Sequence, residues 1–193
     1  MMTGIGVVGG ALTFVGYGLA SYGVAWLLVA CLGLVLHWFG DSLDGTLARF
    51  RRIERNKYGM FLDQTVDVFT VSLIFLGLGL SPWVRFEIAC LFLIGYLMLV
   101  ALTHLRGHVT GIYDVAYGHI GPTEGRLFLL AVTCVMMVVP PFPMTTWPVP
   151  MTSFDHVILG MAVWTLCAYV LGSLKVLKQL AVAEPRIDRR RSR

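Results

Sequence analysis

Residues 40–67 of this chain read GDSLDGTLARFRRIERNKYGMFLDQTVD and hold four aspartates, Asp41, Asp44, Asp63 and Asp67. The chain has only 11 acidic side chains in 193 residues, so these four are more than a third of them. Asp41 and Asp44 are three positions apart and Asp63 and Asp67 are four apart. On a helix, residues at these spacings lie on one face. The stretch therefore predicts two helices that each present a pair of carboxylates.

The composition around this stretch is that of a membrane protein. Hydrophobic residues make up 57% of the chain and charged residues 13%, and the mean hydropathy is +0.77. So little charge cannot cover the surface of a soluble globular protein, and several apolar stretches reach the roughly 20 residues that a transmembrane helix needs. We predict an all-α integral membrane protein with a polar cavity that faces the cytoplasm.

The apolar stretches predict about six transmembrane helices, at 3–20, 23–44, 58–80, 84–105, 122–139 and 154–178. Small residues near Ser21 divide the first two helices, and Pro82 blocks continuation of the third. Residues 140–150, PPFPMTTWPVP, are too rich in proline for a helix and read as a connecting loop.

Basic residues predict the orientation in the bilayer. They cluster at 49–57 and in the tail, 184–193, which we separate from a transmembrane domain at 1–183. Because cytoplasmic loops of membrane proteins are rich in lysine and arginine, both termini and the loops at 45–58 and 106–121 are expected on the cytoplasmic side. The same rule accounts for the basic runs, so no nucleic-acid partner is expected. The basic tail would lie beside anionic lipid head groups. We expect a prokaryotic inner membrane.

Antiparallel packing of the second and third helices would bring the four carboxylates together at one depth. Such a group repels itself unless cations neutralise it. An arginine ion-pair network is one solution, and a hard divalent ion, Mg²⁺ or Mn²⁺, fits oxygen-only ligands better. Arg49 would then bind phosphate. Gly45, Ala48 and Gly59 remove side-chain bulk beside the acids, which favours a nucleotide pocket over helix packing alone.

The two helices together carry a recognisable signature. DSLDGTLAR followed by GMFLDQTVD resembles the pattern D-x2-D-G-x2-A-R … G-x3-D-x3-D of the CDP-alcohol phosphotransferase family, and the six-helix layout is similar to that family as well. All eight defining positions are present, within about 27 residues: Asp41, Asp44, Gly45, Ala48, Arg49, Gly59, Asp63 and Asp67.

The resemblance implies a metal-dependent transfer, in which an acceptor hydroxyl attacks the β-phosphorus of a CDP-alcohol, commonly CDP-diacylglycerol, and CMP leaves. By position, Asp41, Asp44 and Asp63 would hold Mg²⁺ or Mn²⁺, and Asp67 would be a further ligand or the general base. The CDP site would consist of Asp41, Asp44, Gly45, Ala48, Arg49, Gly59 and Asp63. The family also implies a homodimer. Its members commonly carry a Pro-Asn-x-x-Thr stretch before the first helix, whereas this chain opens at MMTGIGVVGG, so we expect a minimal first span.

The acceptor is expected to bind the other polar segment, residues 103–130, where the candidates are Arg106, His119, Glu124 and Arg126. Arg106 and Arg126 could bind a phosphate on the acceptor, as in family members that use glycerol 3-phosphate or inositol phosphate. The stretch GHIGPTEG is also similar to the G-P-x-E-G segment of choline and ethanolamine phosphotransferases, whose acceptor is diacylglycerol. The two resemblances point to different acceptors, and both stay open.

Two non-enzymatic functions are alternatives to the transferase. A divalent-cation transporter would distribute acidic residues along the membrane depth, whereas these acids gather at one end of two helices. A catalytically silent assembly subunit is expected to have lost some of the aspartates, and none is missing. Both patterns favour the enzyme.

Overall fold

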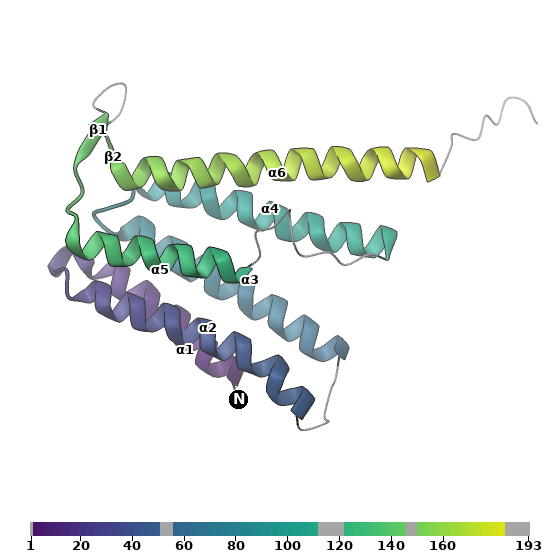
Figure 1. Cartoon of the computed structure of the whole chain (residues 1–193), viewed down its shortest axis with the longest axis horizontal. Coiled ribbons are helices and arrows are strands. Elements are labelled where there is room, and N and C mark those ends of the chain that lie inside the picture. The colour runs from purple at the N-terminus through teal and green to yellow at the C-terminus, as the bar shows by residue number, and fades with distance from the viewer. Residues whose placement is uncertain (1, 51–55, 112–121, 146–149, 184–193) are drawn as a thin grey trace, which may run out of the picture.

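The protein is a bundle of long helices, seen in Figure 1. The computed structural model describes residues 2–50, 56–111, 122–145 and 150–183. Its elements in chain order are α1 (Met2–Gly18), the short 3₁₀ helix η1 (Ala20–Tyr22), α2 (Trp26–Phe50), α3 (Asn56–Leu80), α4 (Phe86–Thr110), α5 (Pro122–Val138), β1 (Pro143–Thr145), β2 (Met151–Thr152) and α6 (Ser153–Ala183).

Each predicted helix has a counterpart, but several are longer than expected. α2 runs to Phe50 rather than to residue 44, and α4 runs to Thr110 rather than to residue 105. Hydropathy marks where a chain leaves the hydrocarbon, whereas a helix continues as long as its backbone hydrogen bonds are made and its residues favour it. Arg106 therefore lies within α4, not in the 106–121 loop where we placed it.

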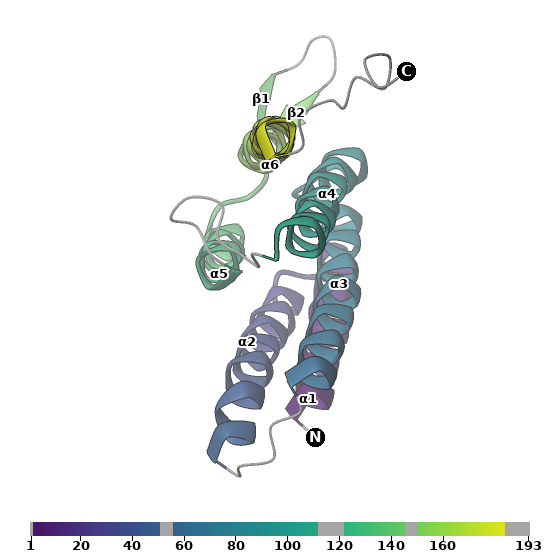
Figure 2. The ribbon, with the colours of Figure 1, turned by 90° about the vertical axis from the view of Figure 1, so that its right-hand side faces the viewer.

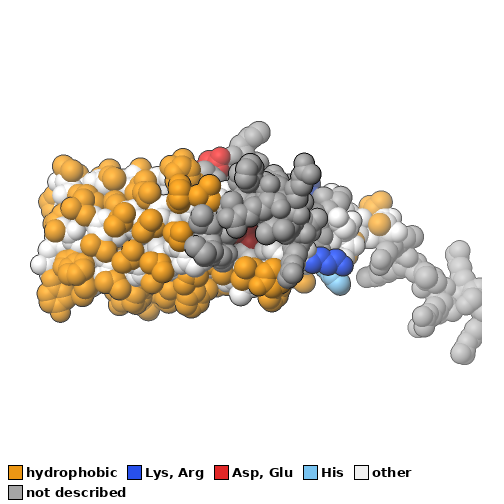
Figure 3. All heavy atoms as spheres, turned by 90° about the horizontal axis from the view of Figure 1, so that it is seen from below, with side chains coloured by type: hydrophobic (Ala, Val, Ile, Leu, Met, Phe, Trp, Pro, Cys, Tyr) orange, Lys and Arg blue, Asp and Glu red, His pale blue; other side chains and the backbone are white. Residues whose placement is uncertain are grey.

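Four of the described helices are long and apolar enough to cross a membrane, at Trp26–Leu43, Lys57–Leu80, Phe86–Thr110 and Ser153–Ala183. The apolar helix at Gly4–Gly18 is shorter, and α5 has 17 residues. Large hydrophobic side chains such as Leu28, Phe69 and Val163 are exposed on their outer faces. In Figure 3 hydrophobic atoms cover most of one half of the molecule, and the visible charged side chains lie outside this half, where some hydrophobic atoms also show. The surface is that of an integral membrane protein, while the count of six spans stays a prediction.

Helix α1 is the centre of the packing, because both α2 and α3 lie against it. At the contact with α2 the backbones nearly touch: a Cβ added to Gly33 would lie 2.5 Å from the backbone nitrogen of Thr13. Only glycine permits this approach. Among the described residues α2 and α3 do not form a closely packed pair. The second and third helices are therefore held together through α1 rather than packed directly on each other.

Helix α5 contacts α1 and α2 and is separated from α6. It packs against α2, and the hydroxyls of Tyr17 on α1 and Thr133 on α5 are 2.6 Å apart in the buried interior. α6 packs along α4, and Figure 2 shows α5 and α6 apart when the bundle is seen from its end. The arrangement separates α5 from α6 and leaves room for a cavity between them.

The end of the bundle that holds β1 and β2 is fixed by one buried carboxylate, Asp155. Its Oδ1 accepts from the backbone N–H of Arg85 at 2.8 Å, and its Oδ2 accepts from that of Thr152 at 2.8 Å. The Thr152 hydroxyl in turn accepts from the Asp155 N–H, which completes a capping box at the start of α6. The proline-rich segment is not only a loop, because β1 within it pairs with β2 directly after it as a short antiparallel ladder.

Candidate active site

Two of the four aspartates meet at one arginine. Arg126, in the first turns of α5, donates from Nη2 to Oδ1 of Asp67 on α3 at 2.9 Å, and from Nη1 to Oδ2 of Asp41 on α2. The three side chains are mostly buried, with exposed fractions of 13% for Arg126, 16% for Asp67 and 25% for Asp41. A guanidinium suits this position because its planar fork can donate to two carboxylates at once.

Asp63 belongs to the same cluster at a more exposed position. It lies one turn before Asp67 on α3, and its carboxyl interacts electrostatically with those of Asp41 and Asp67. The convergence of carboxylates from the second and third helices, predicted from their spacing, is confirmed for these three. The sequence did not reveal that a residue of α5 joins them.

The remaining positions of the predicted donor site are less fully described. The backbone of α2 is helical through Phe50, but the side chains of 44–50 lie outside the described residues, and with them the predicted roles of Asp44, Gly45, Ala48 and Arg49. Gly59 is exposed on α3, and a Cβ added there would meet nothing within 4 Å. The space that a nucleotide would need beside Gly59 is therefore open.

The predicted acceptor residues do not all come together. Arg126 faces the aspartates rather than open solvent. Arg106 is half-buried on α4, and its Nε has no hydrogen-bond partner among the described residues. Glu124 is exposed in the first turn of α5. His119 lies outside the described residues.

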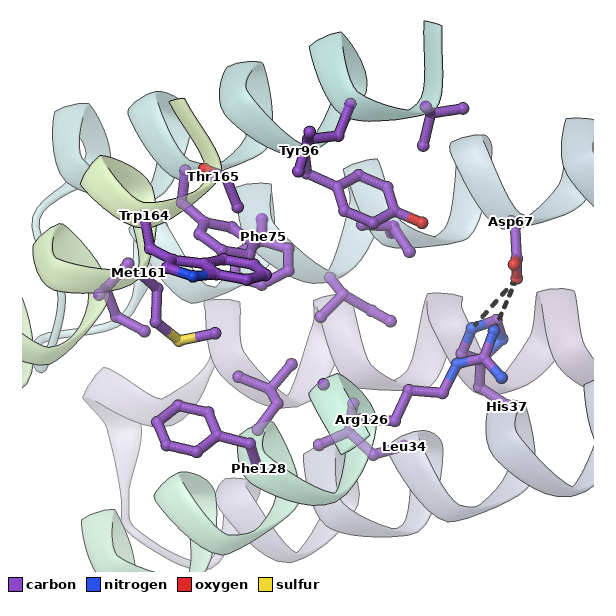
Figure 4. Close-up of a pocket in the computed structure, with 18 of the residues that line it drawn as sticks. Leu34, His37, Asp67, Phe75, Tyr96, Arg126, Phe128, Met161, Trp164 and Thr165 are labelled. Atoms are coloured by element: carbon purple, nitrogen blue, oxygen red, sulfur yellow. Dashed lines mark hydrogen bonds and ion pairs between the residues drawn. The ribbon is translucent and has the colours of Figure 1, made fainter. Parts of the chain in front are cut away.

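A cavity of about 210 Å³ leads away from the carboxylates into the bundle. Residues of α2, α3, α4, α5 and α6 line it, and Figure 4 shows many of these side chains. Most of its wall is apolar, including Phe75, Met161 and Trp164, while Asp67 and Arg126 stand at one end. A molecule with an apolar chain and a polar, charged head would match this lining.

Comparison with known proteins places this geometry in a family. The family model described as CDP-alcohol phosphatidyltransferase matches residues 2–176. The chain belongs to the CDP-alcohol phosphatidyltransferase family. Membership agrees with the resemblance seen in the aspartate signature, and the matched residues include α1 to α5 and most of α6.

Two curated relatives are similar to parts of this chain. An archaetidylinositol phosphate synthase of Pyrococcus horikoshii is 33% identical over 122 residues, which cover 61% of this chain and 64% of the relative. A protein of Aquifex aeolicus, described only as uncharacterized, is 34% identical over 109 residues, which cover 54% of each chain. The chain thus spans between half and two thirds of the length of these relatives. No solved structure matches the chain significantly.

One residue of the site was not predicted from the sequence. His37 on α2 is buried, lines the cavity and lies with its Nε2 3.9 Å from Oδ1 of Asp67. Its signal was present in the spacing, because it stands four residues before Asp41 and so on the same face of α2. Its position within an otherwise apolar run made it resemble a packing residue.

The donor chemistry of the cluster fits a hard divalent ion. Asp41, Asp63 and Asp67 offer only carboxylate oxygens, the ligands that Mg²⁺ and Mn²⁺ prefer. The three carboxylates carry three formal negative charges and Arg126 carries one positive charge. The remaining net charge of −2 would be neutralised by a divalent cation. Among the described side chains, no three His, Cys, Asp or Glu residues already stand where they could hold a metal together. Arg126 instead bridges two of the carboxylates, so metal ligation would require this pairing to loosen.

Proposed function

We propose that the protein transfers a substituted phosphate group, such as phosphatidyl, from a CDP-alcohol to an acceptor hydroxyl and releases CMP. The observation that carries the proposal is the junction of Asp41, Asp67 and Arg126 at the polar end of a cavity with an apolar wall. It offers charged groups for a diphosphate beside a space for a hydrocarbon chain, and CDP-diacylglycerol has both parts. Family membership supports the same reaction class.

The metal in this proposal is Mg²⁺ or Mn²⁺, with Asp41, Asp44 and Asp63 as its ligands. When bound, such an ion stabilises the charge on the diphosphate and on the departing CMP. Gly45, Ala48, Arg49 and Gly59 would accommodate the cytidine diphosphate beside these aspartates.

Asp67 is proposed as the general base, because it is the aspartate of the described cluster that lines the cavity. Its carboxylate takes the proton of the acceptor hydroxyl while the hydroxyl oxygen forms a bond to the β-phosphorus. The bond from that phosphorus to the oxygen of CMP breaks, and CMP leaves with the electron pair. Arg126 holds the carboxylate in place before the reaction, and its guanidinium is suited to bind a phosphate oxygen.

For the acceptor we propose a phosphorylated polyol, with inositol phosphate first and glycerol 3-phosphate second. The Pyrococcus relative is named for an inositol phosphate product, and Arg126, which lines the cavity, supplies a cation for the acceptor phosphate. The alternative is a choline- or ethanolamine-phosphotransferase-like enzyme with diacylglycerol as acceptor, which the G-P-T-E-G stretch at 121–125 favours. A divalent-cation transporter is less well supported, because Asp41, Asp63 and Asp67 form one cluster rather than a path.

We further propose that the carboxylate end faces the cytoplasm of a prokaryotic inner membrane and that the protein is a homodimer. The basic clusters at 49–57 and 184–193 support the orientation. Labelling of single cysteines in these segments from either side of a sealed vesicle would test it.

The experiment that tests the function is a CMP-release screen with purified protein. CDP-diacylglycerol is offered with inositol phosphate, glycerol 3-phosphate, inositol or serine, and CDP-choline is offered with diacylglycerol in parallel. We expect release with a phosphorylated polyol, loss of release in EDTA and recovery with Mg²⁺ or Mn²⁺. Release only with CDP-choline and diacylglycerol would favour the alternative, and metal-independent turnover would refute the carboxylate–metal site.

A further inference from the structure

His37 has a fixed hydrogen-bonding state. The residue is 1% exposed, and its Nδ1 lies 3.2 Å from the backbone carbonyl oxygen of Gly6 on α1. A carbonyl oxygen only accepts, so Nδ1 must carry the hydrogen. In the neutral ring the other nitrogen, Nε2, is then an acceptor with a free lone pair. Helix α1 thus determines what His37 offers to the cavity.

The free nitrogen of His37 has no partner among the described residues, although it is buried. Oδ1 of Asp67 is 3.9 Å away, which is too far for a hydrogen bond, and this oxygen accepts from Nη2 of Arg126 at 2.9 Å with a second lone pair left over. A carboxylate also accepts only, so the two groups cannot satisfy one another. Buried polar atoms without partners are rare and costly. Two acceptors that face one space in a cavity point to a ligand that brings two donors (Figure 4).

We propose that His37 and Asp67 together bind two neighbouring hydroxyls of the acceptor. The reacting hydroxyl donates to Asp67, which takes its proton, and the adjacent hydroxyl donates to Nε2 of His37. Two acceptors 3.9 Å apart suit hydroxyls on adjacent carbons, which present their O–H groups side by side. This inference rests on the proposed function and narrows it, because it makes His37 the residue that selects a polyol.

Binding of two neighbouring hydroxyls by His37 and Asp67 distinguishes the two classes of acceptor that the sequence allowed. Inositol phosphate and glycerol 3-phosphate carry a hydroxyl next to a reacting one, and Arg126 stands beside the same cavity for a phosphate. Diacylglycerol has a single hydroxyl, so it would leave Nε2 of His37 unsatisfied. A buried acceptor that one substrate satisfies and the other does not is a means of discrimination.

The wild-type protein tests this without a mutation. CMP release is measured with each phosphorylated polyol and with its analogue that lacks the hydroxyl next to the reacting one; for glycerol 3-phosphate this is 3-hydroxypropyl phosphate. We expect kcat/KM to fall by about threefold to tenfold for the analogue, the effect of one hydrogen bond. Equal use of both compounds would overturn the pairing. No turnover with any polyol phosphate would refute the proposed acceptor, and this inference with it, and no CMP release with any donor and acceptor of the screen would refute the proposed function itself.

Variants assign the effect to His37. His37→Phe keeps a ring but removes the acceptor, so it should lower kcat/KM for the polyol by the same about threefold to tenfold and leave the analogue almost unchanged. The KM for CDP-diacylglycerol should stay as in the wild type, and His37→Gln should restore part of the loss. His156→Phe is the matched control, because His156 also lies on a helix with Nδ1 2.8 Å from a backbone carbonyl, at the far end of the bundle. An equal loss with both acceptors would show that His37 only supports the fold.

Discussion

Removal of Arg126 should expose how the aspartate cluster is neutralised. In Arg126→Leu, the carboxylates of Asp41 and Asp67 lose the guanidinium that donates to both. A hydrogen bond to a charged group contributes about 1.5–3 kcal/mol, so two of them contribute about 3–6 kcal/mol. Because the three side chains are 13–25% exposed, water offsets part of this, and we expect a loss of about 2–5 kcal/mol.

The assay is thermal unfolding in detergent with EDTA or with Mg²⁺. For a chain of this size the loss corresponds to a decrease in Tm of roughly 5–15 °C in EDTA. Mg²⁺ should restore most of it in the variant, because the ion takes over the neutralising charge, and should change the wild type less.

Two further variants serve as controls for this experiment. Arg126→Lys keeps the charge but cannot donate to both carboxylates in the same fork geometry, so its Tm should fall between those of the wild type and the leucine variant. Arg85→Leu breaks an exposed pair with Glu87 at 3.4 Å and should leave the Tm unchanged. If Arg126→Leu melts with the wild type in EDTA, the guanidinium does not hold the cluster. If Mg²⁺ fails to recover the Tm, the cluster does not bind the ion.

Three further predictions concern the reaction and the packing. Asp67→Asn should reduce CMP release by about 10²–10⁴-fold while leaving metal-dependent binding of CDP intact, and normal turnover would refute the assignment of the base. Asp155→Ala should lower the Tm, since it leaves the N–H groups of Arg85 and Thr152 without their acceptor at a cost of about 1–3 kcal/mol each; an unchanged Tm would show that these contacts are dispensable. Gly33→Ala places a methyl 2.5 Å from the backbone of Thr13 and should destabilise the contact of α1 with α2 by about 1–3 kcal/mol, measured by the same melting experiment; a wild-type Tm would mean that the two helices can separate at no cost.

The course of the helices could largely be predicted from the sequence, because long apolar runs in a membrane have few alternatives to the helix. The errors lie at the helix ends. Phe50 and Thr110 end their helices well outside the apolar runs, and hydropathy does not report where a helix stops in water. The pairing of β1 with β2 depends on contacts between residues that are not neighbours in the sequence, such as Pro143 with Thr152, which composition does not show.

The acidic residues of the site could be predicted from the sequence, but the residues that lie against them could not. The spacing of Asp41, Asp63 and Asp67 placed them on helix faces, and this is local information. The contact of Arg126 with two of them joins residues up to 85 positions apart, and it depends on how α5 packs against α2. His37 was overlooked for a related reason: its role follows from Gly6 on α1, which fixes the tautomer only once the two helices are side by side.

The most direct test of the central claim is the stoichiometry of the products. Purified protein with Mg²⁺, CDP-diacylglycerol and inositol phosphate is sampled over time, and CMP and the new phospholipid are quantified together by mass spectrometry. If the carboxylate cluster transfers a phosphatidyl group to a hydroxyl, the two products should form in equal amounts, and neither should form in EDTA or in Asp67→Asn. CMP without the corresponding phospholipid, or equal yields from Asp67→Asn, would contradict the account.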